Sequence, residues 1–194
     1  MITGFKFKQP FLNFNAEETI EFRPGVNFLV DENSGRSTLI SLIRSFLKDQ
    51  NSTFNGISFP ENSIHIIYQE STLRCFDFER ENLRTLSFNA GNDFFELQQI
   101  SKNKSHSFLT GSLLSAIGSE ENCLYIFDEP DAGLGLKTIK ALGHNMKIAE
   151  TKHCQIIAAV NNPLLMLSQK EIFSMKEKKF INTSYYIQES ISSI

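Results

Sequence analysis

The sequence predicts an α/β fold in which a mostly parallel central sheet is flanked by helices. The first observation is the apolar run at 124–127, which ends in the adjacent carboxylates of Asp128 and Glu129 and then in Pro130. A continuous apolar run of this length is typical of a strand that is buried on both faces of a parallel sheet. The second observation is that strand patterns alternate with helical patterns along the chain, which indicates parallel strands joined by right-handed crossovers.

The first expected elements are strands. Segments 5–12 and 19–22 alternate or look like edge strands, so we expect an antiparallel subsheet near the N-terminus, whereas the continuous run 26–30 is expected to be central. A helix is expected at 37–47, because its apolar residues fall on one face. The remaining expected elements are a loop at 51–62, a strand at 63–68, a small helical insert within 79–107, a helix at 107–117, the strand that ends at Asp128, a helix at 137–150, a strand at 155–160, a short helix from Pro163 and two short closing strands.

Length and composition bound the organisation of the protein. The 194 residues suit one domain spanning 1–194, because two halves would have poor cores. The net charge of −3 argues against a general preference for nucleic acid. No apolar run reaches the roughly 18 residues that span a bilayer, and the N-terminus has no signal pattern, so a cytoplasmic protein without membrane insertion is expected. Cys75, Cys123 and Cys154 are widely spaced, which favours reduced packing thiols over a disulfide or zinc site.

Segment 31–38, with the sequence Asp-Glu-Asn-Ser-Gly-Arg-Ser-Thr, lies between an apolar strand and a helix. A phosphate loop of the pattern G-x-x-x-x-G-K-[ST] uses glycines to let backbone N–H groups curl around phosphates, a lysine for the terminal phosphates and a hydroxyl for the metal. Asp31 stands at the first glycine position and Arg36 at the lysine position. The strand followed by a helix start still predicts a turn that can hold an anion.

Three segments resemble, in the right order, the nucleotide-binding domain of ABC-type ATPases, and specifically the standalone bacterial AAA/SMC-like branch. Segment 22–30 resembles the strand that leads into the phosphate loop, 128–134 resembles the Walker B motif with the following D-loop, and 155–163 resembles the strand that carries the switch histidine. The resemblance covers nearly the whole chain. It implies a P-loop NTPase-like fold with an N-terminal antiparallel subsheet and a small helical insert that carries the signature motif.

The resemblance also implies ATP and Mg²⁺ as cofactors. Ser37 and Asp128 would hold Mg²⁺, Glu129 would polarise water and Arg36 would stabilise the phosphates. Asn161 stands at the position of the switch histidine and is the second candidate catalytic residue. The residues expected to contact the nucleotide are Asn33, Ser34, Gly35, Arg36, Ser37, Thr38 and Gln69.

Four departures from the family pattern act on one chemistry, and the loop is also one residue short. Asp31 would bring a carboxylate close to the phosphates, a repulsion of roughly 3 kcal/mol at about 6 Å and an effective dielectric constant near 20. Arg36 has a longer, planar fork than lysine. Segment 103–109 keeps only the last three residues of the signature motif. Asn161 can donate a hydrogen bond but cannot take up a proton, and it can equally serve as a helix cap before Pro163.

Together these departures predict an ATPase-like protein with weak or absent hydrolysis, acting as a binding or regulatory protein. Its expected partner is a second copy or a related ATPase, contacted through the face that forms the dimer interface in the family, where segment 132–136 is apolar and slim. The alternative is an active ATPase that uses Asp128 and Glu129 with Mg-ATP and drives DNA repair, defence or transport.

Overall fold

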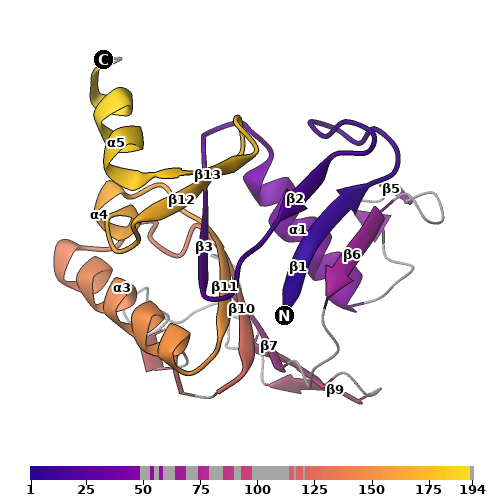
Figure 1. Ribbon diagram of the computed structural model, residues 1–194. Coiled ribbons are helices and arrows are strands. Elements are labelled where there is room, and N and C mark those ends of the chain that lie inside the picture. The colour runs from indigo at the N-terminus through magenta and orange to yellow at the C-terminus, as the bar shows by residue number, and fades with distance from the viewer. Residues whose placement is uncertain are drawn as a thin grey trace.

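A computed structural model describes residues 1–48, 114–115, 117–119 and 121–192, together with the backbone of six strands between residues 53 and 97. Its centre is a six-stranded sheet in the order β13-β12-β3-β11-β10-β7 (Figure 1). These strands are β3 (Val26–Val30), β7 (Arg74–Phe78), β10 (Cys123–Asp128), β11 (Gln155–Ala159), β12 (Glu171–Ser174) and β13 (Lys179–Asn182). All neighbouring pairs are parallel except β12 with β13. The predicted α/β class with a mostly parallel sheet is confirmed.

A second, antiparallel sheet packs beside the central one. It consists of β2 (Thr19–Glu21), β1 (Ile2–Phe7) and β6 (Ile64–Tyr68), with β1 in the middle. The predicted N-terminal subsheet is therefore present, but its first strand begins at Ile2 and ends at Phe7 rather than spanning 5–12. Beyond β1 the chain turns, and Phe11 and Phe14 form only an isolated bridge.

Two hairpins differ from the sequence-based expectation. Segment 51–62 was expected to be a loop, but it contains the paired strands β4 (Thr53–Phe54) and β5 (Ile57–Ser58). The helical insert expected within 79–107 is wrong over the described part, which is an antiparallel pair of β8 (Thr85–Asn89) and β9 (Asp93–Leu97). Polar residues alternate with Leu86 and Phe88 along β8, and alternation of period two favours a strand over a helix. Residues 98–113, which include the signature segment, lie outside the described residues.

Helices cover both faces of the central sheet. They are α1 (Arg36–Lys48), α3 (Leu136–Thr151), α4 (Pro163–Met166) and α5 (Thr183–Ser192). The sequence predicted α1 and α3 to within one residue at each end and the start of α4 at Pro163, whereas α5 was missed because two strands were expected to close the chain. Leu114 and Ser115 are helical, which is all that the described residues show of the helix expected at 107–117. Within the described residues no helix is long and apolar enough to cross a membrane.

The core consists of two clusters on opposite faces of the central sheet. Along β10, Tyr125 and Phe127 enter the cluster against α3 and α4, whereas Leu124 and Ile126 enter the cluster against α1 and the antiparallel sheet. This alternation is the period-two pattern of a strand that is buried on both sides. The buried strands leave the carboxyl ends of β3, β10 and β11 at one edge of the sheet, and the loops that carry the predicted site residues begin there.

Candidate functional site

The turn between β3 and α1 takes a left-handed conformation at three of its five residues. Asp31, Asn33 and Gly35 have φ angles of 78°, 58° and 91°. A Cβ atom at Gly35 would lie 3.2 Å from the ring of Phe14, so this position requires glycine for its space as well as for its backbone angle. The first helical hydrogen bond follows at once, with Leu39 N donating to Gly35 O at 2.9 Å. The turn therefore aims the start of α1 at the edge of the sheet.

The side chain of Asp31 does not face the region where phosphates were expected. Its Oδ2 accepts hydrogen bonds from Ser174 Oγ at 2.7 Å and from Lys176 N at 3.0 Å, and the residue is only 6% exposed. Burial and then the Asp31 carboxylate raise the pKa of Tyr186, so α5 also lies against this group. The carboxylate therefore fastens the turn to the hairpin formed by β12 and β13, whereas its expected repulsion of phosphates stays a prediction.

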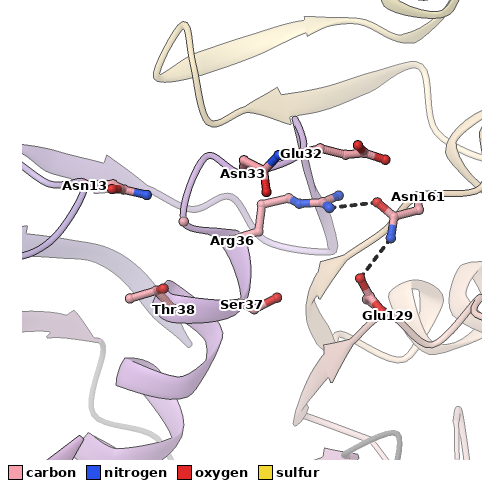
Figure 2. Close-up of a pocket in the computed structure, with 9 residues that line it drawn as sticks. Asn13, Glu32, Asn33, Arg36, Ser37, Thr38, Glu129 and Asn161 are labelled. Carbon is pink, nitrogen blue, oxygen red and sulfur yellow. Dashed lines mark hydrogen bonds between the residues drawn. The ribbon is translucent and has the colours of Figure 1, made fainter. Parts of the chain in front are cut away.

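Arg36 is the buried centre of a hydrogen-bond network (Figure 2). Its Nη1 donates to the backbone carbonyl of Val160 at 2.6 Å, and its Nη2 donates to Asn161 Oδ1 at 2.7 Å. Asn161 Nδ2 in turn donates to Glu129 Oε1 at 3.0 Å. The chain Arg36–Asn161–Glu129 thus links the start of α1 to the ends of β11 and β10. We call it the arginine network.

Ser37 and Asp128 form a second pair beneath the turn. Ser37 Oγ donates to Asp128 Oδ1 at 2.9 Å. Partial burial raises the pKa of Asp128, and the hydrogen bond from Ser37 and the charge of Arg44 partly offset this rise. These two oxygens are donors of the kind that Mg²⁺ prefers, and the structure brings them together as the sequence predicted.

Asp131 holds the loop that presents Asn161. Its Oδ2 accepts hydrogen bonds from the backbone N–H groups of Asn161, at 2.8 Å, and of Asn162. Asn162 caps α4, since its Oδ1 accepts from Leu164 N at 2.9 Å. The alternative role of Asn161 as a helix cap is therefore excluded. Its neighbour caps the helix, which leaves the side chain of Asn161 for Arg36 and Glu129.

A polar pocket of about 460 Å³ opens over these groups. It is lined by Asn13, Glu32, Asn33, Gly35, Arg36, Ser37, Thr38, Glu129 and Asn161 (Figure 2). Glu129 reaches the pocket from a left-handed backbone position with φ of 50°, where its N–H donates to Ala159 O at 3.0 Å. The pocket therefore gathers groups from the turn, the start of α1 and the ends of two strands.

Most of the predicted site residues meet at this pocket. Ser34 is an exception among the turn residues, because it does not line the pocket and its Oγ donates to Asp31 O at 2.5 Å. Asp128 joins the site through Ser37. Gln69 lies outside the described residues. Sequence reasoning missed Asn13 and Glu32: Glu32 was part of the quoted turn but was given no role, and nothing in the sequence near Asn13 indicates that its loop returns to α1.

The comparisons with known proteins give structural similarity only. Neither protein-family models nor curated proteins match the sequence. Among solved structures, CbiO1 from Clostridium perfringens, part of the ABC transporter complex CbiONQ, is similar with a TM-score of 0.44 and 14% identity, over 97% of this chain and 92% of that chain. A structure described as a metal-chelate type ABC transporter in an inward-facing conformation is similar with a TM-score of 0.42 and 13% identity, over 87% of this chain and 76% of that chain.

Proposed function

We propose that the chain binds a nucleoside polyphosphate, ATP by resemblance of its motifs, together with Mg²⁺, and that it hydrolyses the nucleotide weakly or not at all. The support is the pocket at the start of α1. The first residues of the thirteen-residue helix line this pocket, and the positive end of a helix with its N–H groups attracts anions. The oxygens of Ser37 and Asp128 would hold the metal, which supplies positive charge to the phosphates when it is bound.

The proposal of weak hydrolysis rests on the arginine network. Arg36 donates one N–H group of each terminal nitrogen to Val160 O and Asn161, so the protein fixes the guanidinium group and leaves only its remaining N–H groups for a ligand. Glu129 Oε1 accepts from Asn161, which fixes the carboxylate and uses one of its acceptor positions, so fewer remain to orient water. An amide at this position cannot relay a proton. Three groups that would act on a nucleotide are therefore hydrogen-bonded to one another.

The pocket's charge supports the same proposal. Among its lining residues Glu32 and Glu129 carry negative charge, whereas Arg36 carries the positive charge and is already engaged. A polyphosphate would meet repulsion from the two carboxylates unless a divalent cation accompanies it. Binding is therefore expected to depend strongly on Mg²⁺.

Titration calorimetry with and without Mg²⁺ tests the proposal. We expect Mg-ATP to bind more weakly than about 100 µM, which corresponds to roughly −5.5 kcal/mol, with turnover near background. Glu129→Gln is the matched variant, because it keeps the size of the side chain and removes its charge. Micromolar affinity of the wild type, with turnover that Glu129→Gln abolishes, would overturn the proposal.

Micromolar affinity with turnover that depends on Glu129 would support the alternative function, an active ATPase that drives a process such as DNA repair, defence or transport. Its support is the intact pair of Ser37 and Asp128 with Glu129 at the pocket edge. In either case we propose that the protein acts as a homodimer or beside a related ATPase, through the apolar segment 132–136. Leu136 in this segment is 53% exposed, whereas Leu134 packs partly against the core.

A further inference from the structure

Two cysteines that are 31 positions apart in the sequence lie side by side in the central sheet. Strands β10 and β11 are parallel, with Leu124 aligned to Gln155, so Cys123 and Cys154 lie one position earlier at a common level. Both belong to the core cluster that faces α3 and therefore share one face of the sheet. Neighbouring strands are about 4.8 Å apart, and disulfides join residues whose Cα atoms are about 4.4–6.8 Å apart.

The surroundings of the pair favour a thiolate at Cys154. A hydrogen bond with the Cys123 thiol lowers the pKa of Cys154 to about 7 against the opposing effect of burial, and the Lys152 ammonium assists. Tyr125 lies close to both sulfurs, but burial raises its pKa to about 12, so it remains neutral near physiological pH. Thiolates are the reactive form of cysteine toward peroxides.

The pair lies just beneath the surface. Cys123 and Cys154 are each 1% exposed, but the residues directly before them, Asn122 and His153, are exposed. Each sulfur also contacts a backbone carbonyl at this end of the sheet, Cys123 Sγ with Glu121 O at 3.3 Å and Cys154 Sγ with Lys152 O at 3.7 Å. Oxidation of the pair would therefore require a local opening of these two strand starts.

We propose that Cys123 and Cys154 form a reversible disulfide when a hydroperoxide oxidises the protein. The Cys154 thiolate attacks one peroxide oxygen of hydrogen peroxide, the O–O bond breaks, and hydroxide leaves to become water, which gives a sulfenic acid. The Cys123 thiol then attacks the Cys154 sulfur, the S–O bond breaks and a second water leaves. In sum, two thiols and one hydrogen peroxide give one disulfide and two waters, and a dithiol reductant reverses the oxidation.

The disulfide would fasten the start of β10 to the start of β11. The loop that it closes contains all of α3 together with Asp128 and Glu129. Closing a loop of this length restricts the unfolded chain, so the oxidised protein is expected to resist unfolding better than the reduced one. The pocket lies at the other end of these strands, and the inference is independent of nucleotide binding.

The test uses the wild-type chain, because trypsin places each cysteine on a separate peptide. These peptides are 75–80 with Cys75, 105–137 with Cys123 and 153–170 with Cys154. The folded protein is treated with hydrogen peroxide, unfolded in urea that contains N-ethylmaleimide to block the remaining thiols, digested without reduction and analysed by mass spectrometry. We expect peptide 105–137 linked to peptide 153–170, with peptide 75–80 alkylated.

Two further readouts follow the same reaction. The rate of linkage should increase about tenfold between pH 6 and pH 8, as the thiolate fraction of a group with a pKa of about 7 does. The linked protein should unfold about 5–10 °C higher, and dithiothreitol should remove the difference. Cys123→Ala should trap Cys154 as a sulfenic acid that dimedone labels. The proposal fails if the wild type is oxidised in its folded form at pH 8 and both thiols are still alkylated when it is then unfolded. It also fails if Cys154 reacts without linking to Cys123.

Discussion

At the scale of single residues, Arg36 at the start of α1 explains much of the site. Its planar fork presents two donors at once, and the structure uses one on a backbone carbonyl and one on Asn161. A lysine ammonium is a compact point charge on a flexible stem and does not match this pair of acceptors. An arginine at this position therefore differs from a lysine in the shape of its charged group and in the direction in which that group points.

Arg36→Lys is expected to increase Mg-ATP affinity by roughly tenfold, or about 1.4 kcal/mol, because the shorter ammonium leaves Val160 O and is available to phosphates. The same change should lower the free energy of unfolding by about 1.5–3 kcal/mol, since a charge-assisted hydrogen bond in the interior is lost. Calorimetry and urea unfolding measure the two effects. Arg36→Ala is the control, which should lose stability without any gain in affinity.

Asp128→Asn tests the cost of holding a carboxylate in this position. Because burial raises the pKa of Asp128 in the folded protein, ionisation favours the unfolded state and reduces stability at neutral pH. The amide keeps the acceptor for Ser37 and removes the charge, so the variant should have a higher Tm than the wild type at pH 7. This difference should shrink as the pH falls through the folded pKa toward the unfolded value near 4. Thermal unfolding of both proteins over this pH range, without divalent cations, measures the two Tm values. A difference in Tm that stayed constant with pH would contradict the idea.

At the scale of secondary structure elements, the β12–β13 hairpin governs the shape of the turn between β3 and α1. Asp31 keeps a left-handed backbone that costs a non-glycine residue roughly 1–2 kcal/mol, and its bonds to Ser174 and Lys176 N hold it there. The turn supplies the carboxylate that accepts these hydrogen bonds. The donors lie in a hairpin about 140 positions further along the chain.

Asp31→Ala is expected to destabilise the protein by about 2–3 kcal/mol, because it keeps the backbone strain and leaves Ser174 without its acceptor. Asp31→Gly should cost about 1 kcal/mol less, since glycine relieves the strain. Urea unfolding of the two variants beside Asp31→Asn, which keeps an acceptor, measures the contributions. Equal stability of the alanine and glycine variants would show that the left-handed backbone is not strained.

The sequence was sufficient where local pattern decides the structure. The apolar run of β10 and the largely apolar run of β3 predicted their strands nearly to the residue, and Ser37 with Asp128 met as the motifs implied. The sequence was insufficient for β8 and β9, because the polar character of this stretch outweighed the alternation along β8. It also could not reveal the arginine network, since Arg36 and Asn161 are 125 positions apart and neither residue carries a local signal for the other.

At the scale of the whole molecule, the central sheet has chemically different ends. The carboxyl ends of β3, β10 and β11 carry the pocket, as is usual for open α/β sheets, whereas the amino ends of β10 and β11 carry the paired thiols. Segment 132–136 leaves the pocket end and leads into α3. An exposed leucine at this place is available to a second chain.

Leu136→Arg is expected to weaken the proposed association with a second copy or a related ATPase at least tenfold, because a charge at the centre of an apolar contact must be desolvated. Sedimentation over a range of protein concentrations measures the effect. Ile191→Arg is the matched control, since Ile191 is 66% exposed and belongs to α5 rather than to the segment. A wild type that stays monomeric alone and with candidate ATPases, or equal weakening by both variants, would remove segment 132–136 as the partner surface.

The position of β3 within the sheet also has a consequence during synthesis. Both of its neighbours, β11 and β12, follow residue 154, so the ribosome must make most of the chain before β3 has a partner. The hairpin that holds Asp31 is made later still. Contacts between such distant segments form slowly, and the unpaired apolar strand is exposed to aggregation until they form. Nascent chains should therefore acquire the pocket last, and chaperones that bind exposed apolar strands should retain them until then.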